Sequence, residues 1–180
     1  EILKFLLARL IYNDALITVF AFGGIYAKEV FDFSFNDIFL FGIILNVSAG
    51  LGAFLMGFLD DYIGGVKTIQ ISNIGFVIAS LLAALAPSIN QFNIMGCVFE
   101  GNHVFWISGV LIGIFSGPNQ AASRSLMGRL TPKSKESEFY GFYAFSGKAT
   151  AFIGPLLFST VVSFTNDLRY GLVLVAILFI

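Results

Sequence analysis

Residues 38–59 read IFLFGIILNVSAGLGAFLMGFL, and residues 60–67 read DDYIGGVK. The first stretch contains no charged residue and is long enough to cross a bilayer, which takes about 20 residues of α-helix. The second stretch combines two acidic residues, two glycines and a lysine, a composition typical of a turn. Together they predict a membrane-spanning helix that ends at a short polar connection.

The rest of the chain repeats this pattern. Hydrophobic residues make up 57% of the sequence and charged residues only 12%, against about 25% charged in soluble domains. The apolar runs are continuous rather than alternating, so they indicate helices and not a barrel. We predict an all-α integral membrane protein. Its spans cover residues 2–27, 38–59, 68–86, 103–127, 139–164 and 170–180.

The last predicted span is short. Residues 170–180 would form a helix of about 16 Å at 1.5 Å per residue, whereas the hydrocarbon core is about 30 Å thick. We therefore expect the sixth helix to be cut short and sequence to be missing on both sides.

Composition excludes several classes of function. The net charge is −1 and no basic tract is present, so we expect no nucleic-acid partner. The sequence has one cysteine and one histidine, too few for a metal cluster or for most enzymes that work in lipid. We expect no metal, no cofactor and no enzymatic activity.

Positive charges predict the orientation. One side of the predicted topology carries Lys4, Lys67, Arg124, Arg129, Lys133 and Lys135, and the other carries Lys28 and Arg169. Cytoplasmic loops are enriched in lysine and arginine, so we expect the first side, with the N-terminus, to be cytoplasmic.

The polar connection contains four residues with a regular spacing: Gly57, Asp61, Gly64 and Lys67. Gly57 would let two helices approach closely. Asp61 is expected just past a helix end, where it can accept backbone N–H groups. Gly64 suits a tight turn, and Lys67 can pair with an acid at the membrane face. The alternative is a polar hairpin without further function.

This spacing resembles the signature loop between the second and third helices of a major facilitator superfamily half. Gly57, Asp61, Gly64 and Lys67 fall on its fixed positions, and Tyr62 departs from it where the family prefers arginine. The weaker form of the signature is typical of the second half of such transporters.

A narrower resemblance covers most of the chain. It is carried by FLLARLIYND (5–14), GPNQAASRS (117–125), FYGFY (139–143), SGK (146–148) and GP (154–155). These blocks resemble the C-terminal half of the vacuole-effluxer-like branch, which includes bacterial permeases and a fungal vacuolar amino-acid exporter. The resemblance implies helices 7–12 of a twelve-helix fold, a missing N-terminal half, and secondary active transport of a small solute by alternating access. It implies amino acids as a first expectation for the substrate and the bacterial inner membrane as the location.

Two charges lie at similar depths inside predicted spans. Asp14 is about 18 Å along the first span and Lys148 about 14 Å along the fifth, at 1.5 Å per residue. Ionisable groups in a membrane usually face a cavity or a partner. We hypothesise that the two approach one another and couple transport to protons. The alternatives are a permanent ion pair, or a lysine that reaches the headgroups.

Three further positions are candidates on the first and fourth spans. Arg9 and Asn13 are four residues apart and share a helix face. We favour a headgroup anchor for Arg9, and Asn13 can bind a neighbouring helix or a substrate. Arg124 is either a topology signal or the partner of Asp60 or Asp61 in a gate.

Gly113, Gly117 and Pro118 precede Asn119 and Gln120, and we expect them to interrupt the fourth span. Broken helices in transporters line the substrate path, where the two amides would contact the solute. Packing through small residues is an equal alternative. A non-transporting scaffold or receptor also remains open. A channel is disfavoured, because the sequence contains no resemblance to a selectivity-filter loop.

Overall fold

The computed structural model describes residues 2–89, 92–94 and 97–180. These residues form α1 (Ile2–Phe31), α2 (Phe35–Ile63), α3 (Gly65–Leu85), η1 (Ala86–Ser88), β1 (Phe92–Ile94), β2 (Cys97–Phe99), α4 (Gly101–Leu130), η2 (Lys133–Lys135), α5 (Glu136–Ser146), α6 (Ile153–Thr165) and α7 (Leu168–Leu178). The prediction of an all-α membrane fold is confirmed. One addition is the antiparallel hairpin β1–β2, in which Phe92 pairs with Phe99.

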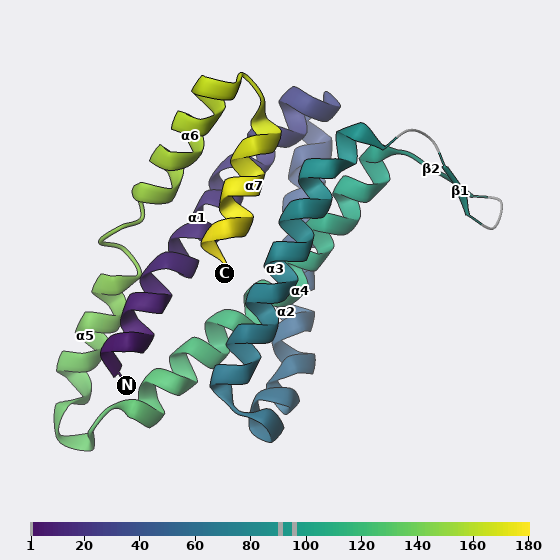
Figure 1. The fold of residues 1–180 in the computed structure, drawn as a ribbon. Helices are drawn as coiled ribbons and strands as arrows, with labels where there is room; N and C mark the ends of the chain where they lie inside the picture. The colour runs from purple at the N-terminus through teal and green to yellow at the C-terminus, as the bar shows by residue number, and fades with distance from the viewer. Residues whose placement is uncertain (1, 90–91, 95–96) are drawn as a thin grey trace.

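The long helices form two groups (Figure 1). α1, α6 and α7 contact one another in the first group, and α2, α3 and α4 contact one another in the second. Contacts between α3 and α7 join the groups, and α5 packs beside the N-terminal part of α1. The C-terminal end of α4 reaches towards α5 and α1, so three helices from distant parts of the chain meet there.

The helices have the length and surface of membrane spans. Within the described residues, three helical segments are long and apolar enough to cross a bilayer: Ile2–Phe31, Phe35–Ile63 and Gly65–Ser88. Large apolar side chains cover the outside of α2, where Phe54 is 68% and Phe58 67% exposed. Such exposure would be costly in water, at about 25 cal/mol per Å², so lipid is the natural solvent of this surface.

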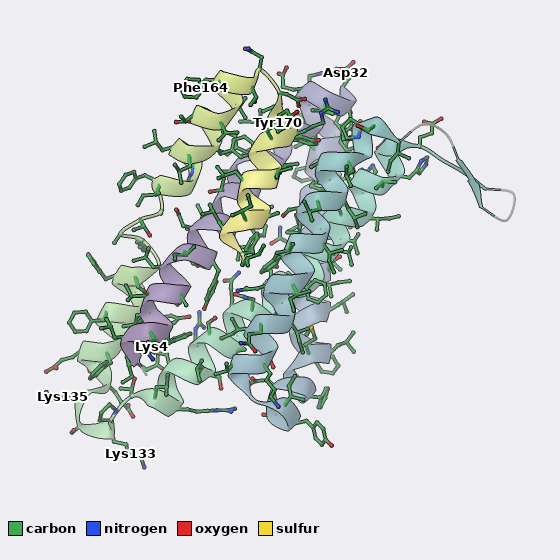
Figure 2. The ribbon with its side chains drawn as sticks, in the orientation of Figure 1. Lys4, Asp32, Lys133, Lys135, Phe164 and Tyr170 are labelled. Carbon is green, nitrogen blue, oxygen red and sulfur yellow. The ribbon has the colours of Figure 1, made fainter. Side chains whose placement is uncertain are left out.

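Three lysines lie together at one end of the bundle. Figure 2 places Lys4, Lys133 and Lys135 at one end, and Asp32, Phe164 and Tyr170 at the other. We call the first of these the basic end. The N-terminus of α1 and the turn η2 lie there, as the distribution of lysine and arginine predicts.

The connection between α2 and α3 is shorter than predicted. α2 continues to Ile63 and α3 begins at Gly65, so only Gly64, with φ of 87°, separates them. Residues 60–63 contain no helix breaker, and the positive φ of Gly64 then turns the chain without steric cost. Asp61 therefore lies inside the last turn of α2 and not past its end, which corrects the prediction.

The fifth predicted span, 139–164, is two helices. α5 ends at Ser146 and α6 begins at Ile153, with turns over residues 147–152. The sequence predicted one continuous span. Pro155 favours the break, because in a helix interior its ring clashes with the carbonyl of residue 151, whereas proline is tolerated in a first helical turn.

The fourth predicted span is unbroken, in contrast to the prediction. α4 runs through Pro118 as a single helix from Gly101 to Leu130. Its glycines pack against α2 instead: a methyl group at Gly117 would overlap the Ala49 carbonyl oxygen, and one at Gly113 would lie 2.5 Å from the Leu45 carbonyl oxygen. The small residues therefore serve the close approach of two helices.

The predicted close approach at Gly57 is absent, because nothing lies within 4 Å of a methyl group built there. The glycine of α2 that meets another helix is Gly52, which lies against the carbonyl of Ile114. Pro118 has no N–H to bond that carbonyl within α4. The glycine of α2 that approaches α4 closely therefore lies five residues before the predicted one.

Candidate functional site

Polar side chains gather where α1, α4 and α5 meet. They surround a cavity of about 80 Å³ lined by Arg9, Tyr12, Asn13, Asn119, Gln120, Ser123, Arg124 and Tyr143. Five of these eight residues were predicted as site residues: Arg9, Asn13, Asn119, Gln120 and Arg124. Two other predicted residues, Asp14 and Lys148, do not line the cavity.

A larger cavity of about 190 Å³ lies among α1, α2, α3, α4 and α7, with mostly apolar walls that include Phe41, Phe105 and Leu172. It contains no ionisable residue except Tyr26. Because polar and ionisable groups inside a membrane are costly and usually functional, we take the smaller, polar cavity as the candidate site.

Hydrogen bonds fix one wall of the polar cavity. The Ser123 hydroxyl donates to the Asn119 carbonyl at 2.6 Å, so its single proton is used. Tyr12 must then be the donor in the 2.8 Å bond between its hydroxyl and Ser123 Oγ. This chain of two bonds connects α1 to α4, and the Asn119 amide donates to Asn73 Oδ1 of α3 at 2.9 Å. The wall is therefore held by three helices.

The opposite wall is the end of α5, which α1 holds through two side chains. Arg9 Nη1 donates to the Tyr143 carbonyl at 2.7 Å and to Ser146 Oγ at 3.0 Å, and the guanidinium lies 3.7 Å from the centre of the Tyr143 ring. Asn13 Nδ2 donates to the Gly147 carbonyl at 2.9 Å. Asn13 satisfies the carbonyl of Gly147, just after α5, whereas the Tyr143 carbonyl also accepts from the Gly147 N–H at 3.3 Å. The cation of Arg9 complements the negative end of the α5 dipole.

Asp14 holds the start of the next helix. Its Oδ2 accepts a hydrogen bond of 2.6 Å from the backbone N–H of Gly154, in the first turn of α6. The residue that precedes α6, Phe152, provides no side-chain cap. The carboxylate therefore replaces a missing local cap, at the positive end of the α6 dipole.

One turn and a half of α1 thus bridges the break in the fifth span. Arg9 and Asn13 bond the backbone at the C-terminal end of α5, and Asp14 bonds the backbone at the beginning of α6. The signs of Arg9 and Asp14 match the two helix dipoles that they face. Side chains of α1 thus bond the backbone on both sides of the break, at Gly147 and at Gly154.

The hypothesised pair of Asp14 with Lys148 is not formed. Three ion pairs are present among the described residues, and neither residue takes part in any of them. Lys148 is exposed and lies in the turns between α5 and α6, whereas Asp14 is 5% exposed. The second oxygen of Asp14, Oδ1, is buried without a hydrogen-bond partner. The headgroup anchor that we favoured for Arg9 is also not observed, because Arg9 donates hydrogen bonds to α5.

At the basic end, Asp60 and not Asp61 is the buried acid of the α2–α3 motif. Asp60 Oδ2 lies 3.5 Å from Arg129 Nη2, and its Oδ1 is buried without a partner. The predicted pairing of Asp60 or Asp61 with Arg124 is absent, because Arg129 takes that place. Lys67 is exposed and forms no ion pair within the described part of the chain.

Three lining residues were missed by sequence reasoning: Tyr12, Ser123 and Tyr143. Ser123 is four residues after Asn119, so the helical repeat that placed Asn119 at the site could have found it. Tyr12 and Tyr143 carried no such signal, because their roles depend on the contact of α1 with α4 and α5. No cluster of metal-ligating side chains occurs among the residues that were searched, which are the described ones.

Comparison with known proteins gives a family. The model of the family described as "Vacuole effluxer Atg22 like" matches residues 1–180. Relatives include Autophagy-related protein 22-2 of Aspergillus niger, 27% identical over all of this chain and 30% of the relative. Autophagy-related protein 22 of Candida glabrata is also 27% identical, over all of this chain and 33% of the relative. No solved structure matches.

The chain spans about a third of the length of these relatives. They are fungal proteins, and the family description refers to the vacuole. The predicted location in a bacterial inner membrane is therefore wrong. It rested on the bacterial permeases in the branch that the sequence resembles.

Proposed function

Because this chain belongs to the Atg22-like vacuole effluxer family, we propose that it forms part of a secondary active transporter that moves a small solute by alternating access. The family is one of transporters and not of enzymes. Amino acids are the first solutes to test. We propose that the polar cavity between α1, α4 and α5 is part of the path of the solute.

The observation that carries this proposal is the cavity itself. Eight polar side chains converge in a bundle whose surface and interior are otherwise mostly apolar. Secondary transporters build their sites in this way, near broken helices and between two repeats. The break between α5 and α6 lies beside the cavity, because Arg9 and Asn13 both line the cavity and hold the end of α5.

We further propose that a second six-helix half of the same polypeptide supplies the facing wall. Gln120 and Arg124 line the cavity and are both exposed in the described structure. A polar surface of this kind needs either water or protein over it. A facing half would close the site and let the two halves rock about it.

The alternative is a membrane scaffold or receptor without transport. It explains the spans but gives no reason for two arginines and three amides around one cavity. A carrier and a scaffold differ in flux, since only a carrier gives saturable, gradient-driven movement of solute.

The test is uptake of radiolabelled amino acids by liposomes that contain the full-length protein. We expect Gln120→Ala to lower uptake at subsaturating solute by several-fold, because it removes a polar contact from the cavity. Gln70→Ala is the matched control, since Gln70 is exposed on α3 and does not line the cavity. Equal uptake by both variants and the wild type would contradict a role of the cavity in the solute path. Uptake that never saturates would favour a scaffold without transport.

Proton coupling is a separate part of the proposal and depends on Asp14. Asp14→Asn keeps an oxygen that can accept from Gly154 but removes the charge. If Asp14 carries the coupling proton, this variant exchanges solute across the bilayer but no longer concentrates it under an imposed pH gradient. Unchanged flux and coupling in the variant would refute the role of Asp14.

A further inference from the structure

The polar cavity has an unbalanced charge. Two of its lining residues are arginines, Arg9 and Arg124, and none of its lining residues is acidic. Neither arginine takes part in the three ion pairs of the described residues. Asp60 and Asp14 are engaged elsewhere, by Arg129 and by the start of α6.

Most of the guanidinium donors are also unused. A guanidinium has five N–H donors, and the hydrogen bonds of Arg9 all come from Nη1 to neutral oxygens. Arg124 makes no hydrogen bond or ion pair within the described part of the chain, although it lines the same cavity as Arg9. Two cations that share a cavity repel each other, and an oxyanion between them would remove that cost.

The size of the cavity limits what enters it. The volume open to the centre of a water-sized sphere is about 80 Å³, and a single water molecule needs only about 10–15 Å³ of such volume. A carboxylate or phosphate group therefore fits, with the rest of the molecule outside. The planar fork of arginine suits the paired oxygens of such groups.

From this geometry we propose that the transported solute carries an oxyanion group, and that this group binds between Arg9 and Arg124. The inference rests on the transport function proposed above. The three amides that line the cavity, from Asn13, Asn119 and Gln120, are neutral and leave the net charge of the site positive. The bound oxyanion group orients the solute. The part of the solute that lies outside the cavity then distinguishes one anionic solute from another.

Binding is tested on the purified full-length protein in phosphatidylcholine nanodiscs, with butyrate and its uncharged analogue butyramide as probes. Binding to the folded state raises the unfolding temperature with ligand concentration, which yields a dissociation constant. We expect butyrate to stabilise the wild type and butyramide not to do so. Similar stabilisation by both probes would overturn the proposal.

Arg124 is the residue to vary, because a change at Arg9 would also release α5. Arg124→Gln should weaken butyrate binding by roughly tenfold or more, the effect of losing a hydrogen bond to a charged group. Arg124→Lys should weaken it less, since a point charge remains. Lys133→Gln removes a cation from the same end without touching the cavity, and it should leave binding unchanged. An equal loss in Arg124→Gln and Lys133→Gln would overturn the proposal.

Three further results separate the possible sources of the anion and the possible failures. If phosphatidylglycerol in the nanodisc stabilises the protein through Arg124 and butyrate does not, the anion is a lipid headgroup and the proposal fails. If liposomes show saturable transport that is indifferent to Arg124→Gln, the anion site fails and transport stands. If butyrate binds through Arg124 but no solute is moved, the anion site stands and transport fails.

Discussion

The carboxylate of Asp14 accepts a hydrogen bond of 2.6 Å from the backbone N–H of Gly154, a residue 140 positions later in the chain. The bond joins the middle of α1 to the first turn of α6. Five residues before Asp14, Arg9 holds the end of α5. One helix thus contacts the end of α5 and the beginning of α6, so α1 supports the break between them.

Removal of the Asp14 carboxylate should destabilise the protein. Asp14→Ala leaves the Gly154 N–H buried without a partner, at a cost of about 1–3 kcal/mol in the free energy of unfolding. Asp14→Asn should cost less, because the amide oxygen can still accept. The measurement is thermal unfolding of the full-length protein. Asp61→Ala serves as a control, since Asp61 is exposed and should be near neutral; an equal loss in both alanine variants would contradict the capping role.

A methyl group at Gly154 should also disturb this contact. It would overlap the Thr18 hydroxyl oxygen and lie 3.0 Å from the Asp14 carbonyl oxygen. Gly154→Ala must therefore push α6 away from α1, and we expect a loss of about 1–3 kcal/mol, as for other overpacked positions. Gly141→Ala is the matched control, because nothing lies within 4 Å of a methyl group there. Equal unfolding temperatures for the two variants would show that α6 can move freely.

Acid should weaken the cap of α7. Asp167 accepts from the backbone and side chain of Arg169, and these bonds with the guanidinium hold the pKa of Asp167 below its usual value near 3.9. The pKa is lower in the folded state than in the unfolded state, so the stabilisation is complete above the unfolded value and is lost as pH falls through the folded value.

The comparison of Asp167→Asn with the wild type isolates this effect. The variant should unfold at a lower temperature at pH 6, and the difference should shrink as the pH falls below about 3.9. Thermal unfolding from pH 6 to pH 3 measures it. A difference between the two proteins that is independent of pH would mean that Asp167 acts through its shape and not its charge.

Much of the helical layout could be predicted from the sequence, because the length and polarity of each apolar run carry that information. The six predicted spans overlap the helices α1, α2, α3, α4, α5 with α6, and α7. The boundaries were less accurate. α2 extends past the acidic pair at residues 60–61, since a charged residue does not by itself end a helix and Gly64 does.

Five of the eight residues that line the polar cavity were among the predicted site residues, but their contacts were not predicted. Arg9, Asn13, Asn119, Gln120 and Arg124 were recognised as polar groups in apolar runs, and the structure brings them together. The pairing of Asp14 with Lys148 was inferred from depth alone. Depth does not give the direction of a side chain, and no periodicity in the sequence shows that a carboxylate from one helix caps another.

Close packing of α2 on α4 should make two glycines respond in opposite directions to the same substitution. A methyl group at Gly117 would overlap the Ala49 carbonyl and lie 2.9 Å from Ala53 Cβ, whereas nothing lies within 4 Å of one at Gly50. Gly117→Ala should therefore destabilise the protein by about 1–3 kcal/mol through overpacking. Gly50→Ala should stabilise it by about 0.5–1 kcal/mol, because alanine restricts the unfolded backbone more than glycine does. Thermal unfolding of the two variants measures both signs, and a shift in the same direction for both would show that the helices can separate at Gly117 without cost.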